Sequence, residues 1–500
     1  MLMHSFKATT APLEILAGVR SGLIPAFCFF QYNVLSPAQL HNLSLSLYRA
    51  AEEGGLPPPI IGIDQEGGQL IAVTNGATEL PGNMALGATR SASLAREAGQ
   101  VLARELLAMG VNMNFAPSVD INTNPYSPGI GTRSFGDNPH LVGELGTAMI
   151  EGMQGEGLIA TAKHFPGHGS TTVDSHYDLP VVDLPRERLE AVELVPFKSV
   201  IKAGVGCIMS AHIRVDALDP VNPGTLSRRI LTDLLREEMD YDGLIVTDAM
   251  DMDAVARLGH ERIVNQAIAA GADLILLGHL PNQFALTDQS KPYWTADSLE
   301  RIRKWREKLL RADQLPPMSV VGCAEHQAVA QRIADAAVTL THGELPLRVN
   351  GDDLIAIITV QPKNLTPADT SGSAQITLAE AITKRHANTR AIQVPRSADD
   401  AAIREALWAS DEATAVVIGT LDAFRDESQR VLVKALNERG QRVYIAALRT
   451  PYDAAVLANG SAAVLCTYSM RPASCESAAR ALFGEIPTQG ILPCRIDDVK

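Results

Sequence analysis

The chain has 500 residues, of which 46% are hydrophobic and 20% charged, so it is long enough for two or three domains with sizeable cores. Its 43 basic and 57 acidic side chains give a formal net charge of −14. This acidic balance argues against nucleic acid as a main partner, because phosphate binding requires a basic surface. A neutral small-molecule substrate remains compatible with it.

Six cysteines lie far apart without any C-x-x-C pair, so we expect reduced, buried thiols in a cytoplasmic protein. No apolar run reaches the roughly 18 residues of a membrane span. The first residues, MLMHSF, do not have the pattern of a secretory signal. A true start upstream of Met1 would reopen secretion or lipidation. Nothing in the sequence indicates the oligomeric state.

Eight short apolar runs alternate with amphipathic stretches, which predicts a (β/α)8 TIM barrel. The expected strands are residues 1–6, 26–30, 60–64, 112–116, 159–165, 207–213, 244–248 and 273–277. Helices are expected, among others, over 92–109, 139–156, 186–203, 226–239 and 299–310.

We divide the chain into a catalytic barrel (1–314), a linker with a bridging helix (315–345) and a smaller α/β sandwich (346–500). The prolines of Leu315-Pro316-Pro317 mark the linker, and a helix is expected over 324–340. The sandwich should contain strands at 354–360, 415–419, 443–448 and 462–467. We expect it to contribute packing and stability and no catalytic residue, with Glu427 on a solvated helix surface.

Ionisable residues follow the expected barrel strands, where such barrels place their chemistry. They are Asp64 and Glu66 after the third strand, Asp120 beyond the fourth, Lys163 and His164 at the fifth, His212 at the sixth, Asp248 at the seventh and His279 after the eighth. A structural role is easy to imagine for any one of them, but less so for the whole set.

The segment 163–176 carries Lys163, Asp174 and three histidines, and its glycines and proline predict a mobile loop leaving a strand. In the order Asp174-Ser175-His176, the carboxylate can hold one ring nitrogen while the other meets substrate. Asp248, where a strand stops, supplies a carboxylate for an electrophilic carbon. A nucleophilic aspartate and a separate proton donor describe retaining glycoside cleavage. Asp251 and Asp253 are interpreted as the first turn of the next helix.

Other chemistries find less support. The chain has no P-loop, no H-E-x-x-H and no G-x-S-x-G motif. A metal-dependent barrel hydrolase stays open because of the histidines, although the first strand offers only His4 instead of H-x-H. We expect no metal and no cofactor.

Five motifs in order resemble the two-domain β-N-acetylglucosaminidases of glycoside hydrolase family 3. They are DQEGG at 64–68, RSFG at 133–136, KHFPGHG at 163–169, DSH at 174–176 and TDAM at 247–250, and the tail 467–493 resembles the family's second domain. The resemblance implies Asp248 as the nucleophile, His176 as general acid/base with Asp174 as its partner, and Asp64, Arg133, Lys163 and His164 as sugar-binding residues. It implies cleavage of terminal β-linked N-acetylglucosamine from peptidoglycan-derived muropeptides, with the loop moving His176 in and out during turnover.

Two positions depart from the family pattern, which usually has arginine where this chain has Gln69 and Ala72. The second of these arginines contacts ligand in the resembled enzymes. Two alternatives remain open. One is a phosphorylase, since a histidine does not repel phosphate as a carboxylate would. The other is a catalytically silent carbohydrate-binding homologue.

Overall fold

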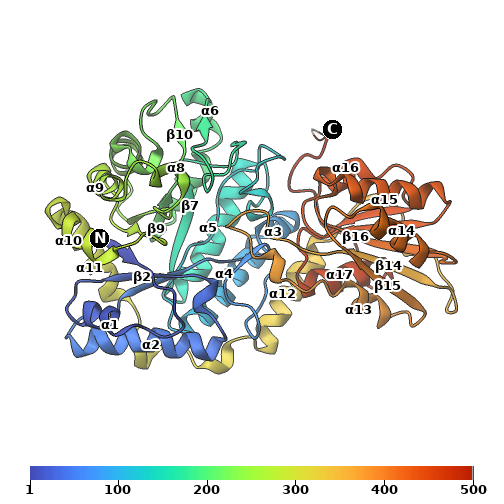
Figure 1. Ribbon diagram of the computed structural model, residues 1–500, viewed down its shortest axis with the longest axis horizontal. Coiled ribbons are helices and arrows are strands. Elements are labelled where there is room, and N and C mark those ends of the chain that lie inside the picture. Colours follow the sequence, from blue (N-terminus) through green and yellow to red (C-terminus); the bar gives the residue numbers. More distant parts are fainter. Residues whose placement is uncertain (498, 500) are drawn as a thin grey trace.

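The computed structural model describes residues 1–497 and 499, which form a barrel and a second, smaller domain (Figure 1). All eight barrel strands lie in chain order and pair in parallel. Leu2 of the first strand pairs with Ile275 of the last, and a bridge between Val246 and Leu274 closes the remaining gap. The expected TIM barrel is therefore confirmed. Its strands are β1 (Leu2–His4), β2 (Ala26–Phe29), β3 (Ile60–Ile63), β6 (Met113–Asn114), β7 (Ile159–Phe165), β9 (Cys207–Ser210), β11 (Leu244–Thr247) and β12 (Ile275–Leu276).

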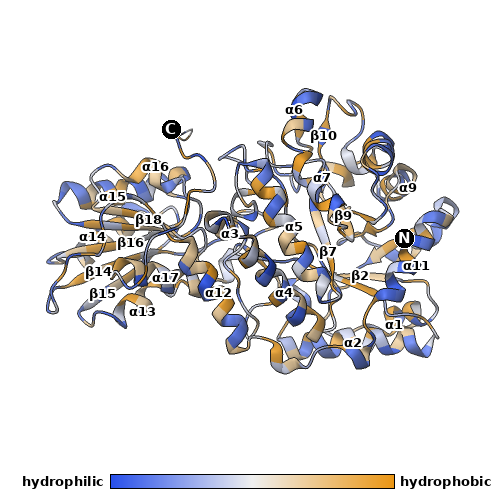
Figure 2. Cartoon of the chain, turned by 180° about the vertical axis from the view of Figure 1, so that it is seen from behind, coloured by the Kyte–Doolittle hydropathy of each residue, from blue (hydrophilic) through white to orange (hydrophobic). Residues whose placement is uncertain are grey.

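Helices surround the barrel and bury their apolar faces against it, and Figure 2 shows mostly hydrophobic strands inside these amphipathic helices. Side-chain caps begin several of them: Ser91 accepts from the backbone of Leu94, and Asn138 from that of Leu141. The surrounding helices are α1 (Leu13–Arg20), α2 (Pro37–Glu53), α4 (Ala92–Ala108), α5 (Pro139–Gly155), α6 (Arg186–Ala191), α7 (Val195–Lys202), α8 (Asp253–Ala256), α9 (His260–Ala270), α10 (Gln283–Ser290) and α11 (Ala296–Lys308).

Two expected helices differ in detail. The stretch 186–203 is broken into α6 and α7, because Pro196 has no backbone N–H and fits the first turn of a new helix. The stretch 226–239 forms a π-helix over Arg229–Glu238 instead of an α-helix.

The second domain is a six-stranded sheet between two layers of helices (Figure 1), so the expected smaller α/β sandwich is confirmed. Its order is β13 (Thr339–Gly343), β18 (Ala463–Cys466), β17 (Val443–Ala447), β16 (Ala415–Thr420), β14 (Ile355–Val360) and β15 (Thr389–Val394), with only β13 antiparallel to its neighbour. One layer contains α12 (Ala324–Ala337), α13 (Leu378–Thr383) and α17 (Pro472–Leu482), and the other contains α14 (Asp400–Ala409), α15 (Glu427–Glu438) and α16 (Asp453–Leu457).

Sequence analysis missed both edge strands of this sheet. The expected helix 324–340 ends at Ala337, and β13 follows it within the segment assigned to the linker. In β15, Arg390 and Gln393 are exposed, so the strand lacks the continuous apolar run of a central parallel strand. Glu427, as expected, lies exposed in the first turn of α15.

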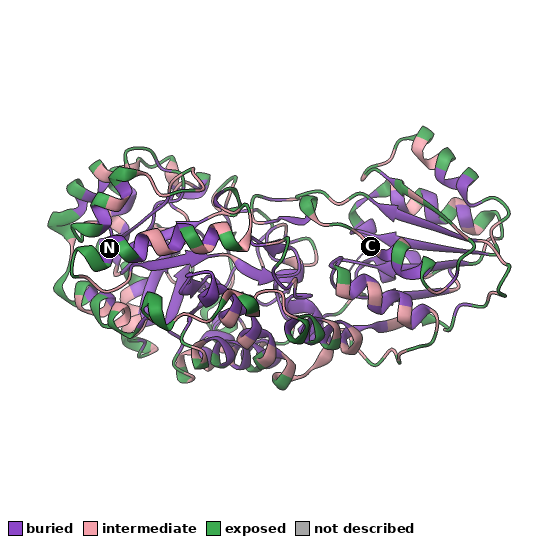
Figure 3. Cartoon of the chain, turned by 90° about the horizontal axis from the view of Figure 1, so that it is seen from below, coloured by how far each residue is buried: buried purple, intermediate pink, exposed green. Residues whose placement is uncertain are grey.

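The two domains share more than a linker. Met84, Ala85 and Ala88 of α3 (Asn83–Thr89), a helix of the barrel segment, are buried in the core of the second domain. The C-terminal tail returns to the barrel, where the Ile491 backbone N–H donates to the Ala88 carbonyl at 2.9 Å. Figure 3 shows buried residues in both sheets and in the helices that pack on them. These contacts fix the second domain against the barrel.

All six cysteines are free thiols, and only Cys323 is not buried. Among the described residues, no helix combines the length and apolar character that crossing a membrane requires.

Candidate active site

One cavity of about 490 Å³ lies at the carboxyl ends of the barrel strands. The seven site residues predicted from the sequence all line it, although they come from segments as far apart as β3 and β11. They are Asp64, Arg133, Lys163, His164, Asp174, His176 and Asp248.

Asp248 directly follows β11 and lines this cavity. Its backbone N–H donates to the Ser210 carbonyl of β9 at 3.1 Å, and its Oδ1 accepts from the Ala249 N–H at 2.8 Å. Burial alone would raise the pKa of Asp248, but the imidazoles of His164, His212 and His176 outweigh this effect and lower it to about 2. At neutral pH the group is therefore a carboxylate able to attack a carbon atom.

His176 and Asp174 form the dyad expected from their spacing. Asp174 Oδ1 lies 2.7 Å from His176 Nδ1 and also accepts from the His176 backbone N–H at 3.0 Å. Burial tends to lower the pKa of His176, but the hydrogen bond and negative charge of Asp174 raise it overall. The protonated imidazolium is thus stabilised relative to a free imidazole, and Nε2, which has no hydrogen-bond partner among the described residues, can give its proton to a ligand.

The loop between β7 and β8 (Val181–Val182) holds this dyad. The ring of His168 contacts two other residues of this loop, with Nδ1 2.8 Å from Thr171 Oγ1 and Nε2 3.2 Å from Ser175 Oγ. The His168 backbone N–H donates to Asp120 Oδ1 at 2.6 Å. Because both ring nitrogens have hydrogen-bond partners, we assign His168 a structural role in maintaining the conformation of the loop. The expected movement of this loop stays a prediction.

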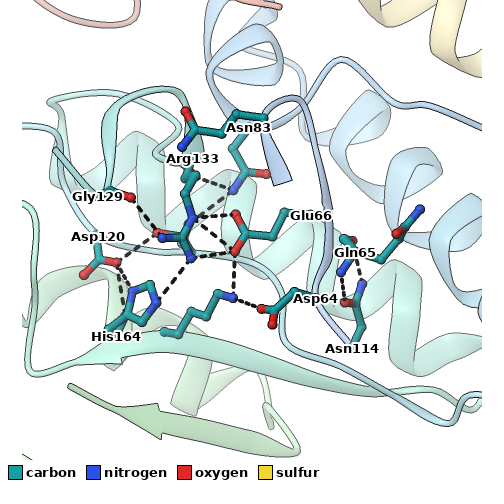
Figure 4. A network of polar contacts seen from close by, with 12 residues as sticks. Asp64, Gln65, Glu66, Asn83, Asn114, Asp120, Gly129, Arg133 and His164 are labelled. Atoms are coloured by element: carbon teal, nitrogen blue, oxygen red, sulfur yellow. Dashed lines mark hydrogen bonds and ion pairs between the residues drawn. The ribbon is translucent and has the colours of Figure 1, made fainter. Parts of the chain in front are cut away.

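Glu66 connects two cationic site residues in a buried network (Figure 4). Its carboxylate accepts from Arg133 Nη2 at 2.7 Å and lies 2.6 Å from Lys163 Nζ. Burial tends to raise the pKa of Glu66, whereas Arg133 and Lys163 lower it to about 2. Sequence analysis noted Glu66 at a strand end but gave it no role. It is the counter-charge that allows two cations to be buried here.

This network limits what Arg133 and Lys163 can offer a sugar. Lys163 has three N–H donors and directs two of them to Asp64, at 2.5 Å, and Glu66. Arg133 gives its donors to Glu66, to the Gly129 carbonyl at 2.9 Å and to His164 Nε2 at 3.3 Å. Among the described residues, one N–H of each cation has no partner and is left for a ligand.

His164 and Asp64 complete the inner part of the cavity. Asp120 Oδ2 lies 2.6 Å from His164 Nδ1 and fixes the ring, and the pKa of Asp120, which burial would raise, is held below its usual range by His164. The Asp64 side chain is 31% exposed, which leaves a carboxylate oxygen accessible to hydroxyl groups.

Two aromatic residues that were not predicted from the sequence, Phe30 and Tyr32, line the same cavity beside His279. The rings of Phe30 and Tyr32 are stacked with centroids 5.4 Å apart, and His279 lies 4.7 Å from Phe30. Asp251 Oδ2 holds His279 through Nδ1 at 2.7 Å. Our interpretation of Asp251 as part of a helix turn is wrong, because α8 begins only at Asp253. The position of His279 after the eighth strand was the available signal.

The second domain also contributes to the cavity wall, although only packing and stability, and no catalytic residue, were expected from it. The contributing residues are Asn364, Pro367, Ala368, Asp369 and Thr370. They follow the carboxyl end of β14. The rule that parallel strands present ligand-binding loops at their carboxyl ends could have singled them out.

The two departures from the family pattern lie next to this wall. Ala72 lines the cavity, and Gln69 is buried beside it. Gln69 Oε1 accepts from Thr132 Oγ1 at 2.8 Å and from Arg449 Nη2 of the second domain at 3.1 Å. Where the family usually has an arginine, this chain therefore has Gln69 in contact with the guanidinium of Arg449 from the second domain. Within the described residues, no three His, Cys, Asp or Glu side chains are grouped so that they could share a metal ion.

Comparison with known proteins defines the class to which this fold and site belong. The model of the glycosyl hydrolase family 3 N terminal domain matches residues 3–288. Beta-hexosaminidase A of Pseudoalteromonas piscicida is 31% identical over 553 residues, covering 98% of this chain and 92% of that protein. The chain therefore belongs to glycoside hydrolase family 3.

Further relatives are similar to this chain, one over the barrel and one over its whole length. A beta-hexosaminidase of Nitrosomonas eutropha is 36% identical over 288 residues, covering 56% of this chain and 81% of that protein. The solved structure of a family 3 beta-N-acetylglucosaminidase from Paenibacillus sp. str. FPU-7 has a TM-score of 0.92 and 32% identity, covering 100% of this chain and 98% of its own. The chain is thus a two-domain glycoside hydrolase similar throughout to enzymes of this kind.

Proposed function

We propose that this protein is a retaining exo-β-N-acetylglucosaminidase in which Asp248 is the nucleophile and His176 the general acid/base. The observation that carries the proposal is the presence in one cavity of an ionised Asp248 and a His176 whose free Nε2 is backed by Asp174. These are the two groups that cleavage with retention needs, with histidine in place of the usual carboxylic acid. The full-length similarity to beta-hexosaminidases supports the choice of sugar.

In the first step, a carboxylate oxygen of Asp248 attacks the anomeric carbon of the sugar. The bond from that carbon to the leaving oxygen breaks, and the leaving oxygen takes the proton from His176 Nε2. The result is an ester between the sugar and Asp248, with a neutral His176.

In the second step, His176 Nε2 removes a proton from water as the water oxygen attacks the anomeric carbon. The ester bond breaks, the Asp248 carboxylate is regenerated, and His176 is again protonated. Two successive inversions leave the sugar in its original β configuration.

Asp64, Arg133, Lys163 and His164 would hold the sugar during both steps. Asp64 can accept hydrogen bonds from sugar hydroxyls, and the one free donor on each of Arg133 and Lys163 can reach sugar or N-acetyl oxygens. As the natural substrate we propose peptidoglycan-derived muropeptides with a terminal β-linked N-acetylglucosamine, which the family resemblance implies.

Whether water or phosphate attacks the anomeric carbon in the second step can be tested directly. An aryl N-acetyl-β-glucosaminide is incubated with the enzyme in matched buffers with and without phosphate, and the products are identified. Free N-acetylglucosamine in both buffers supports the hydrolase. A sugar 1-phosphate formed only with phosphate would instead assign a phosphorylase. No product in either buffer would favour the catalytically silent homologue.

A further inference from the structure

A loop of the second domain, residues 361–374, is fastened to a hairpin of the barrel. The hairpin consists of β4 (Gln65–Gly67) and β5 (Leu70–Ile71). The Thr370 backbone N–H donates to the Gln69 carbonyl at 2.9 Å, and Thr370 Oγ1 accepts from the Ile71 N–H at 3.0 Å. One threonine thus binds the barrel backbone on both sides of Leu70 and aligns the loop with this edge of the cavity.

Arg449, which follows β17, forms hydrogen bonds to both the loop and the barrel hairpin. Its Nη2 donates to Asp369 Oδ2 at 2.8 Å and to Gln69 Oε1 at 3.1 Å, and its Nη1 donates to Ser371 Oγ at 3.1 Å. Arg449, Asp369 and Gln69 are all buried. A buried guanidinium with several partners is costly to displace, so the loop is held firmly where it lines the cavity.

Among the described residues of this loop that line the cavity, Asn364 is the one with an unused side-chain hydrogen-bond donor. Its Oδ1 accepts from the Gly372 N–H at 2.6 Å, which leaves the amide hydrogens of Nδ2 facing no partner among the described residues. Asn364 is exposed and lines the cavity, which is also lined by the buried residues Leu70 and Ala72 of the adjoining hairpin region.

We propose that the second domain completes the substrate site, with Asn364 donating from Nδ2 to an uncharged oxygen of the bound glycoside and Arg449 and Thr370 as positioning residues. Asn364 thus offers a donor in the same cavity that Ala72 lines without any side-chain donor of its own. Because the amide is neutral, it suits a hydroxyl or carbonyl oxygen, whereas an arginine favours a carboxylate. This proposal rests on the proposed function for the identity of the ligand.

The first test compares Asn364→Ala and Asn364→Asp with the neighbouring Lys363→Ala as control. Lys363 is exposed and does not line the cavity, so its variant should behave as wild type. Loss of one hydrogen bond to substrate should raise KM about three- to tenfold and change kcat less than about twofold. Asn364→Asp should be at least as impaired, because it replaces a donor with a negative charge. An unchanged KM in both Asn364 variants would overturn the proposal.

The second test addresses positioning. Thr370→Val keeps the side-chain shape but removes the bond to Ile71, and it should raise KM by a similar factor without lowering the melting temperature enough to unfold the protein at the assay temperature. In the double variant with Asn364→Ala, the two effects should be less than additive, because both act through one contact. Full additivity would show that Thr370 does not position Asn364.

A binding measurement separates this proposal from the proposed function. Calorimetry with N-acetylglucosamine and Asp248→Asn protein, with and without Asn364→Ala, needs no turnover. Weaker binding in the double variant supports the loop even if the wild type cleaves no aryl glycoside, in which case the proposed function alone fails. If the wild type turns over normally and Asn364→Ala changes neither binding nor KM, the proposed role of the loop alone is overturned.

Discussion

His176 Nδ1 lies 2.7 Å from Asp174 Oδ1, whereas Asp174 Oδ2 is buried and has no hydrogen-bond partner among the described residues. Among the described residues, the hydrogen bonds of this carboxylate therefore go to His176 alone, through its ring and its backbone N–H. Burial would raise the pKa of Asp174, but the bond to His176 lowers it, and the same bond raises that of His176. The dyad behaves as one proton-donating unit.

Asp174→Asn should shift the pH profile of kcat/KM. In the wild type, activity should fall as pH rises through the His176 pKa, which lies above its ordinary value of 6.5. Without the carboxylate, burial pushes that pKa down, so the descending limb should move to lower pH. The maximal rate should drop about 100-fold. A variant profile that coincides with that of the wild type would mean that Asp174 does not tune His176.

His176→Ala should discriminate between leaving groups. Substrates whose leaving group needs no protonation, such as dinitrophenyl glycosides, should keep their glycosylation rate, whereas poor leaving groups should lose about 100-fold or more. Pre-steady-state kinetics on both substrates measures this step. An equal loss on both would remove His176 from the role of acid.

Glu66→Gln should destabilise the fold as well as the site. The substitution leaves the buried Arg133 and Lys163 with less compensating charge, which should cost about 3–5 kcal/mol of unfolding free energy. Denaturant unfolding measures it, and Glu427→Gln on exposed helix surface is the matched control. Equal stability of the two variants would contradict the role assigned to Glu66.

Truncation after Leu340 tests the junction between the domains. It would expose Met84, Ala85 and Ala88 of α3, which are buried in the second core. We expect poor solubility and a lower melting temperature than that of the full chain. A soluble, stably folded barrel with wild-type KM would contradict both the packing role and the shared substrate site.

Local patterns in the sequence predicted the barrel and placed Asp64, Lys163, His164 and Asp248 at strand ends, which converge in such a barrel, whereas Arg133 was predicted only from the family resemblance. They could not predict contacts between distant segments. Thr370 and Gln69 are 301 positions apart, and nothing near either residue indicates the other. The role of Glu66 was hidden similarly, since its partners Arg133 and Lys163 lie on other elements. β15 escaped notice because an edge strand can be half polar.

In the proposed mechanism, Asp248 carries the sugar as an ester during turnover. The most direct measurement is mass spectrometry of the protein after reaction with a slowly hydrolysed fluorinated N-acetylglucosaminyl fluoride, followed by peptide mapping. We predict one sugar adduct on the peptide containing Asp248, absent from Asp248→Asn, which should also lose nearly all turnover because an amide cannot form the ester. An adduct on another residue, or substantial turnover by Asp248→Asn, would contradict the role of Asp248 as the nucleophile.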